Sequence, residues 1–204
     1  GGYWAWDPVE NASLMPWLIT TAFLHSIQVQ ERRGMLKVWN ASLIVTAFSL
    51  ALLGTFMVRS GILDSIHAFG ASTVGPPILV LIACVVLGST ALIVSRLDEL
   101  RAPKRIESLA SREAVFLVNN LLLVGLCAVI FWGTFFPLIS EALTGDERTV
   151  GPPFFNSVTT PLAILLVLFT GIGPLLAWRQ VSAGRLWDLL WRPAAAAAAV
   201  TAAL

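Results

Sequence analysis

Two histidines and a group of tryptophans are the side chains of this chain best suited to bind a ligand. His25 lies within a long apolar stretch, and His67 follows the next apolar stretch. A neutral imidazole is a common ligand of transition metals, including the iron of a porphyrin. The segment before the first apolar stretch contains three aromatic residues, Tyr3, Trp4 and Trp6. Their rings offer flat apolar area, which suits a planar ligand.

Each histidine also has a simpler interpretation. For His67, the residue type alone favours a solvated loop histidine without a ligand. For His25, an interhelical hydrogen bond explains the residue about as well as a ligand role does, although an ionisable side chain at membrane depth is a functional candidate. Helical spacing places four side chains on one stripe, which are Trp17, Thr21, His25 and Gln28. We expect this stripe to face the interior of a helix bundle rather than lipid.

The polar residues near these positions have structural explanations. Asp7 and Glu10 are spaced for an acid–base pair, but they also fit a helix capping box with Pro8 at the first helical position. We favour capping. Asn119 and Asn120 lie within an apolar stretch, where interhelical hydrogen bonding is the expected role.

The composition predicts a membrane protein. Hydrophobic residues make up 57% of the 204 residues and charged residues 12%, a balance that excludes an ordinary soluble domain. We predict an all-α, polytopic transmembrane helix bundle, treated as a single domain over 1–204, because an open sheet leaves backbone groups unpaired in lipid. Pro16 is expected to kink the first span or to separate an interfacial turn from it. Five full spans are predicted near 13–30, 38–58, 77–95, 114–139 and 159–178, and a truncated sixth begins near Pro193.

Two further features narrow the function classes. Cys84 and Cys127 each lie mid-way along an apolar run, so we expect both to be buried, and neither belongs to a Cys-x-x-Cys or Cys/His spacing. The 96–112 loop is basic, but it also carries acidic residues and lacks interleaved aromatic residues. Nucleic acid is therefore not an expected partner, and membrane lipid is the expected surrounding.

The basic residues predict the orientation in the membrane. Eleven of the thirteen Lys and Arg residues fall in three loops, at 31–37, 96–112 and 179–192, and only Arg59 and Arg148 lie elsewhere. The positive-inside rule assigns the three loops to the cytoplasm. The Trp-rich segment and His67 are then both expected on the outer side.

Two sequence strings carry a resemblance to a known family. The N-terminal string G-G-Y-W-A-W-D-P-V-E-N-A-S, residues 1–13, resembles the WWD motif of heme-handling proteins of cytochrome c maturation, and its continuation is most similar to the CcmF and NrfE heme lyases. The string R-S-G-I-L-D-S-I-H-A-F, residues 59–69, is similar to the same family over its whole length. Weaker support comes from G-T-F-F-P-L at 133–138 and V-G-P-P-F-F-N at 150–156. The resemblance favours a ligand role for His67.

The resemblance implies a heme lyase of the bacterial inner membrane. Such an enzyme accepts heme at the periplasmic face and supports its covalent attachment to the CXXCH motif of an apocytochrome c. His67 would then be an axial ligand of this substrate heme, and His25, near Trp17, would hold a separate heme b within the bundle. The implied partners are a CcmE-like heme chaperone, apocytochrome c and CcmH-like maturation subunits. Residues 1–13 would form an outer-face heme segment whose binding residues are Tyr3, Trp4, Trp6 and Asp7.

Two alternatives remain from the residues themselves. One is a transporter of heme or another hydrophobic solute, and the other is a non-catalytic membrane scaffold whose tryptophans form an interfacial belt. The resemblance also predicts that the chain is a central fragment of a longer protein, because the family has a second outer histidine upstream and a second membrane histidine downstream. We therefore do not expect lyase activity from this fragment alone.

Overall fold

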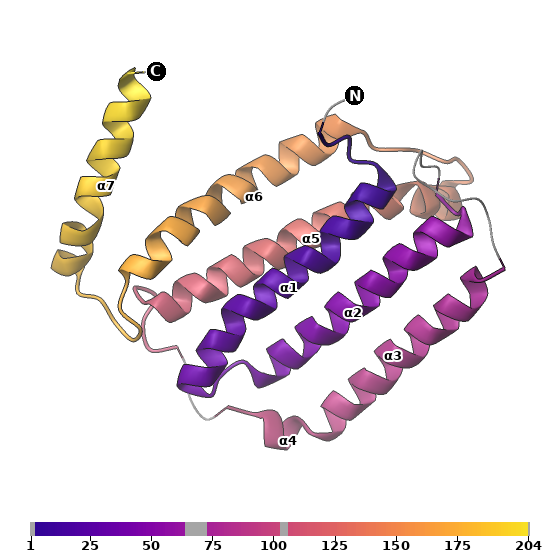
Figure 1. The fold of residues 1–204 in the computed structure, drawn as a ribbon, viewed down its shortest axis with the longest axis horizontal. Helices are drawn as coiled ribbons and strands as arrows, with labels where there is room; N and C mark the ends of the chain where they lie inside the picture. The colour runs from indigo at the N-terminus through magenta and orange to yellow at the C-terminus, as the bar shows by residue number, and fades with distance from the viewer. Residues whose placement is uncertain (1–2, 64–72, 103–105, 204) are drawn as a thin grey trace.

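The computed structural model describes residues 3–63, 73–102 and 106–203. Within these ranges the chain forms seven α-helices, one short 3₁₀ helix and no strand, which confirms the predicted all-α fold. His67 lies outside the described residues. Figure 1 labels the elements, which are α1 (Pro8–Arg33), α2 (Lys37–Ser60), α3 (Gly75–Ser95), α4 (Leu97–Leu100), α5 (Arg112–Thr144), α6 (Pro152–Ile172), η1 (Gly173–Leu175) and α7 (Ala183–Ala203).

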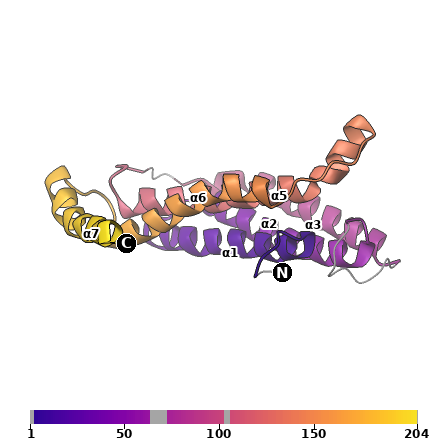
Figure 2. The same ribbon diagram turned by 90° about the horizontal axis from the view of Figure 1, so that it is seen from above.

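The helices α6, α5, α1, α2 and α3 lie side by side in a row, in that order, and α7 stands apart from them (Figure 1). α1 packs between α2 and α5, α3 packs on α2, and α6 packs on α5. The main apolar core lies where α1, α2 and α5 meet, around Met15, Ala22 and Leu123. α5 has 33 residues, a length of about 50 Å against a hydrocarbon core of about 30 Å, and its C-terminal part leaves the layer of the other helices (Figure 2).

α1 is the central helix although it is more polar than its neighbours. Four helical segments of the described chain are long and apolar enough to cross a membrane, namely α2, α3, α5, and α6 extended through η1. α1 is long enough but carries Asn11, His25 and charged residues near its ends. Because α2 and α5 cover it, lipid does not have to solvate all of these groups. The predicted span at 13–30 lies within α1, and its crossing of the membrane stays a prediction.

α1 continues through Pro16, which excludes the interfacial turn, one of the two alternatives predicted for this proline. The predicted starts of two later helices were wrong. α6 begins at Pro152 rather than near 159, since a proline at the first helical positions loses no intrahelical hydrogen bond. α7 begins at Ala183, and Pro193 lies inside it rather than at its start. Cys84 is exposed because α3 is at the edge of the row, whereas Cys127 is buried as predicted.

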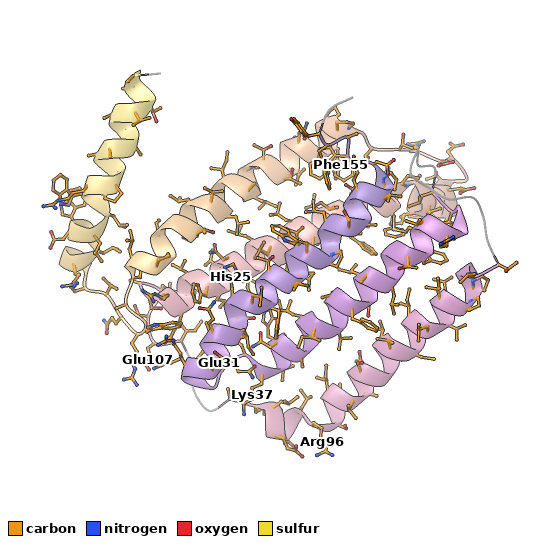
Figure 3. The ribbon with its side chains drawn as sticks, viewed as in Figure 1. His25, Glu31, Lys37, Arg96, Glu107 and Phe155 are labelled. Atoms are coloured by element: carbon orange, nitrogen blue, oxygen red, sulfur yellow. The ribbon has the colours of Figure 1, made fainter. Side chains whose placement is uncertain are left out.

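The three basic loops meet at one end of the row, which we call the basic end. The backbone N–H of Arg112 donates to the carbonyl of Ala177, and that of Val181 donates to the carbonyl of Ala110, both at 2.9 Å. These bonds join the start of α5 to the segment after η1. In Figure 3, Lys37, Arg96 and Glu107 lie at this end. The shared position agrees with the charge distribution, and the membrane side that this end faces stays a prediction.

Candidate functional site

The turn that leads into α1 fixes the position of the aromatic segment. Asp7 is the N-cap of α1, and its Oδ1 accepts the N–H of Val9 at 2.9 Å. Glu10 Oε2 accepts the N–H of Asp7 at 3.1 Å and the N–H of Ala5 at 2.9 Å. The predicted capping box is therefore confirmed, and Glu10 also holds the residues that precede the helix.

Trp6 has an unusual backbone conformation. Its φ of 60° lies in the left-handed region, which is uncommon for a residue other than glycine. Two hydrogen bonds hold the residue there. The side-chain amide of Asn11 donates to the Trp6 carbonyl at 3.1 Å, and the indole Nε1–H of Trp6 donates to Asn156 Oδ1 at 2.8 Å. The left-handed turn therefore directs the indole of Trp6 toward the start of α6.

Four aromatic rings from two distant segments pack together at this end of the molecule. Trp6 stacks on Phe155 with ring centroids 4.9 Å apart and planes 10° from parallel. Trp4 meets Trp6 edge to face at 5.8 Å, and Phe154 meets Phe155 in the same way at 5.4 Å. Figure 3 shows Phe155 near the start of α1, at the opposite end of the row from Glu107. We call these four residues, Trp4, Trp6, Phe154 and Phe155, the aromatic platform.

α5 supports the platform through a glycine and a threonine. A Cβ atom at Gly133 would lie 2.6 Å from Cε1 and Cζ of Phe155, so only glycine allows this approach. At the next position, Thr134 Oγ1 accepts a hydrogen bond of 2.9 Å from the side-chain amide of Asn11. Asn11 is fully buried. The platform thus rests on the junction of α1, α5 and α6.

A planar ligand can reach the platform from its open surface. The cavity that borders Trp6 and Phe155 has a volume of 190 Å³, below the roughly 300–1,000 Å³ of typical ligand pockets, so it does not enclose a porphyrin. By contrast, Tyr3 is fully exposed and Trp4 is 41% exposed. The site that the structure offers is an exposed aromatic surface rather than a closed pocket.

His25 lies on α1, in the part of the helix nearer the basic end (Figure 3). Its imidazole is half-buried, and its ring centroid is 5.8 Å from that of Phe116 on α5. The Nδ1 atom is buried, and no hydrogen-bond partner for it is found among the described residues. The accessible part of the ring is therefore the side away from Nδ1. The imidazole therefore keeps one side open to a ligand, and a neutral imidazole can serve as a metal ligand.

The stripe that contains His25 does not face the interior of the described bundle, contrary to the prediction. The buried face of α1 is formed by other residues, among them Met15, Ile19 and Ala22. On the stripe, Trp17 is 59% exposed and Gln28 is exposed. The hydroxyl of Thr21 donates to its own helix, to the carbonyl of Trp17, at 2.8 Å. The stripe is an open face of α1, and the helical spacing alone could not indicate which face the neighbours cover.

The remaining candidates have different outcomes. The prediction for Asn120 is confirmed, because its Oδ1 accepts the indole N–H of Trp39 on α2 at 2.9 Å. Asn119 is buried, but its Oδ1 has no partner in the described part of the chain. Sequence reasoning did not assign Phe155, Asn156 or Gly133 to the site. The strings at 133–138 and 150–156 contained the signal, since both were already similar to the family.

The basic end of α1 is organised by charge rather than by aromatic rings. Arg33 is 6% exposed and pairs with two carboxylates, that of Glu113 on α5 and that of Glu107 in the loop before α5. Its Nε lies 2.9 Å from Oε1 of Glu113, which is 1% exposed. The hydrogen bond with Glu107 raises the pKa of Arg33, so this guanidinium stays charged at all physiological pH values. The pairs tie the end of α1 to the start of α5.

The N-terminal part of the chain, which includes Trp4 and Trp6 of the platform, is similar to a known protein family. The family profile described as "Cytochrome C assembly protein" matches residues 1–63, which include the Trp-rich segment and all of α1 and α2. Over these residues the chain is therefore similar to the cytochrome c assembly class, and the match lies within a row of apolar helices.

Individual relatives make the assignment narrower. The chain is 45% identical to the cytochrome c-type biogenesis protein CcmF of Pseudomonas aeruginosa, over 100% of this chain and 31% of the relative. It is 47% identical to the biogenesis protein CycK of Bradyrhizobium diazoefficiens, over 88% of this chain and 27% of the relative. A solved structure titled cytochrome c heme lyase CcmF is similar with a TM-score of 0.65 and 38% identity, covering 89% of this chain and 26% of that one. The chain is similar to one part of the CcmF-type biogenesis proteins, and it spans about three tenths of the length of the curated relatives it matches.

Proposed function

We propose that this chain is the part of a heme lyase that presents heme at the outer membrane surface for attachment to apocytochrome c. The observation that carries this proposal is the aromatic platform. Two of its segments, 1–13 and 150–156, are similar to the heme lyase family, and they meet in space through the stacked rings of Trp6 and Phe155. The exposed rings of Trp4 and Tyr3 leave room for a planar substrate beside this stack.

In this function heme at the platform is a substrate. Its macrocycle would lie against the exposed indole of Trp4, and His67, which follows α2 in the sequence, would provide an axial ligand. Formation of the thioether bonds depends on ferrous iron and on correctly placed thiols more than on a protein acid or base. Asp7 therefore acts as a helix cap that fixes the position of Trp6, and not as a proton donor.

His25 would hold a second heme, a resident heme b. The geometry fits a ligand role, because the imidazole is half-exposed on the open face of α1 and its buried Nδ1 has no partner among the described residues. A bound heme b would supply reversible one-electron chemistry for reduction of the substrate iron. The chain's own contribution is to fix the imidazole against Phe116 and to keep water away from its inner edge.

The cellular setting follows from the same proposal. The aromatic platform would face the periplasm of a bacterium, and the basic end would face the cytoplasm. The partners would be a CcmE-like heme chaperone, apocytochrome c and CcmH-like maturation subunits. Cysteines introduced at Thr149 and Ala110 test the orientation, since only the first should react with an impermeant thiol reagent added to intact cells. Labelling of Ala110→Cys alone would reverse the orientation.

The substrate role is tested with His67→Ala in the intact protein. This variant should abolish the maturation of c-type cytochromes in cells that depend on the protein, while its heme b absorbance and its insertion into the membrane stay at the level of the wild type. His67→Cys should retain part of the activity, because a thiolate also ligates heme iron. Normal levels of mature cytochrome c in the His67→Ala strain would contradict the proposal.

A further inference from the structure

Two arginines meet on the faces of one indole at the basic end. The guanidinium of Arg32, in the last turn of α1, lies 4.7 Å from the ring centroid of Trp178, and that of Arg112, the first residue of α5, lies 5.4 Å from it. Cation–π contacts of this kind orient guanidinium groups that are otherwise free to rotate. Trp178 thus brings together two positive charges from different helices.

Within the described residues, neither guanidinium forms an ion pair with a carboxylate. The ion pairs found at the basic end, within the described ranges, use Arg33, Arg96 and Arg101. Arg112 donates instead to two neutral carbonyls, through Nε to Leu176 at 2.9 Å and through Nη2 to Pro174 at 2.6 Å. A guanidinium has five N–H donors, so Arg112 keeps donors for a further acceptor. Together, Arg32 and Arg112 form a site that is suited to an anion with more than one acceptor oxygen.

This cationic site is continuous with the position of His25. Arg32 follows His25 by seven residues, which places it about 10 Å further along nearly the same face of α1. A second connection runs through α5, because Phe116 packs against both His25 and Trp178, at 5.8 Å and 5.7 Å between ring centroids. The open face of α1 therefore has an imidazole in its apolar part and paired guanidinium groups at its end.

Heme has the same distribution of chemistry, with iron at the centre of an apolar ring and two propionate carboxylates on one edge. Building on the heme b role of His25, we propose that Arg32 and Arg112 bind the propionates of that heme. The heme is then oriented with its propionates toward the basic end and its apolar edge toward Trp17. Charge-assisted hydrogen bonds from arginine to carboxylate are stronger than neutral ones, and the planar guanidinium can donate two of them in parallel.

The test uses the intact protein with both arginines changed, Arg32→Gln with Arg112→Gln. The amount of heme b retained after purification in detergent should fall several-fold. The midpoint potential of the remaining heme should fall at neutral pH, because uncompensated propionate charge stabilises ferric iron. It should rise again toward acidic pH as the propionates take up protons. The double Lys variant, which keeps both charges, should recover much of the heme content, and Arg101→Gln, which removes an exposed charge at the same end, should behave as the wild type.

The outcomes separate this proposal from the one on which it rests. If His25→Ala loses heme b while the double Gln variant keeps the wild-type content and potential, His25 is a ligand and the arginine site is wrong. If His25→Ala itself keeps its heme b, the ligand assignment fails and the arginine site fails with it. Loss of co-purifying anionic phospholipid from the double Gln variant, with unchanged heme, would show that the arginines bind lipid headgroups and would also overturn the proposal.

Discussion

The two ends of α1 are built in different ways. At the end that carries the aromatic platform, which we call the platform end, the contacts between distant segments are neutral, since Trp6 stacks on Phe155 and the amide of Asn11 bonds to Thr134. At the basic end the contacts are charged, since Arg33 pairs with Glu113 and Arg32 lies over Trp178. The first arrangement depends on shape, because a ring can stack closely only where Gly133 leaves space. The second depends on the number and sign of the charges.

The difference fits two kinds of ligand. A surface of exposed aromatic rings offers area without strong directional bonds, which suits a substrate that must arrive and leave. A ligand atom in a half-buried position with cationic groups nearby suits a cofactor that stays. The comparison predicts that changes of volume affect the platform end, whereas changes of charge or of a ligand atom affect the basic end.

The largest expected effect comes from removing the ligand atom. In the intact protein, His25→Ala should lose most of the stably bound heme b and its Soret absorbance, because no other described side chain on this face replaces the imidazole. Added imidazole should restore part of the signal. Gln28→Ala, on the same stripe and exposed, is the matched control and should keep its heme. Unchanged heme content and potential in His25→Ala would leave His25 as a packing residue.

Removal of a buried charge at the basic end comes next. Glu113→Ala takes away the 1% exposed partner of Arg33 and should lower the free energy of unfolding by about 3 kcal/mol, the lower end for breaking a buried pair, because Glu107 remains. Glu99→Ala removes the partner of Arg96 in an exposed pair and should change the free energy of unfolding by less than about 1 kcal/mol. Thermal unfolding in detergent measures both. Equal effects would mean that burial of the ion pair with Arg33 does not increase its contribution to stability at the basic end.

Much of the fold could be predicted from the sequence, because long apolar runs leave few alternatives to membrane-length helices. The capping box at Asp7 and Glu10 was also predictable, because it is a local interaction between neighbours in the chain. The start of α7 was not, because Pro193 was taken as a boundary although the helix accommodates it.

The site was less predictable because its residues are far apart in the sequence. Trp6 and Phe155 carry no local pattern that relates them, and only the structure brings the two rings together. The opposite error occurred for the stripe of Trp17 and His25. The helical spacing does place these residues on one face of α1. Whether that face is covered depends on where α2 and α5 pack. Propensity and spacing describe a helix, and they do not specify its neighbours.

A change of side-chain volume should act at the platform end. Gly133→Ala would place a Cβ atom 2.6 Å from Phe155 and force that ring away from Trp6, at a cost of about 1–3 kcal/mol. Cytochrome c maturation should fall with it, while heme b at His25 stays bound. Gly125→Ala on the same helix has open space around its Cβ and should be neutral or slightly stabilising. Equal behaviour of the two variants would show that the stack on Phe155 does not matter for function.

The smallest effect is expected at Asp7, where it separates capping from chemistry. Asp7→Ala removes the oxygen that accepts the N–H of Val9, and loss of an N-cap of this kind costs about 1 kcal/mol. Asp7→Asn keeps an acceptor oxygen at the same place and should retain both stability and cytochrome c maturation. The comparison of the two variants is informative because asparagine caps a helix but cannot carry a carboxylate's charge or proton. If Asp7→Asn keeps the stability of the wild type and still abolishes maturation, the carboxylate takes part in heme handling, and the platform end depends on charge as the basic end does.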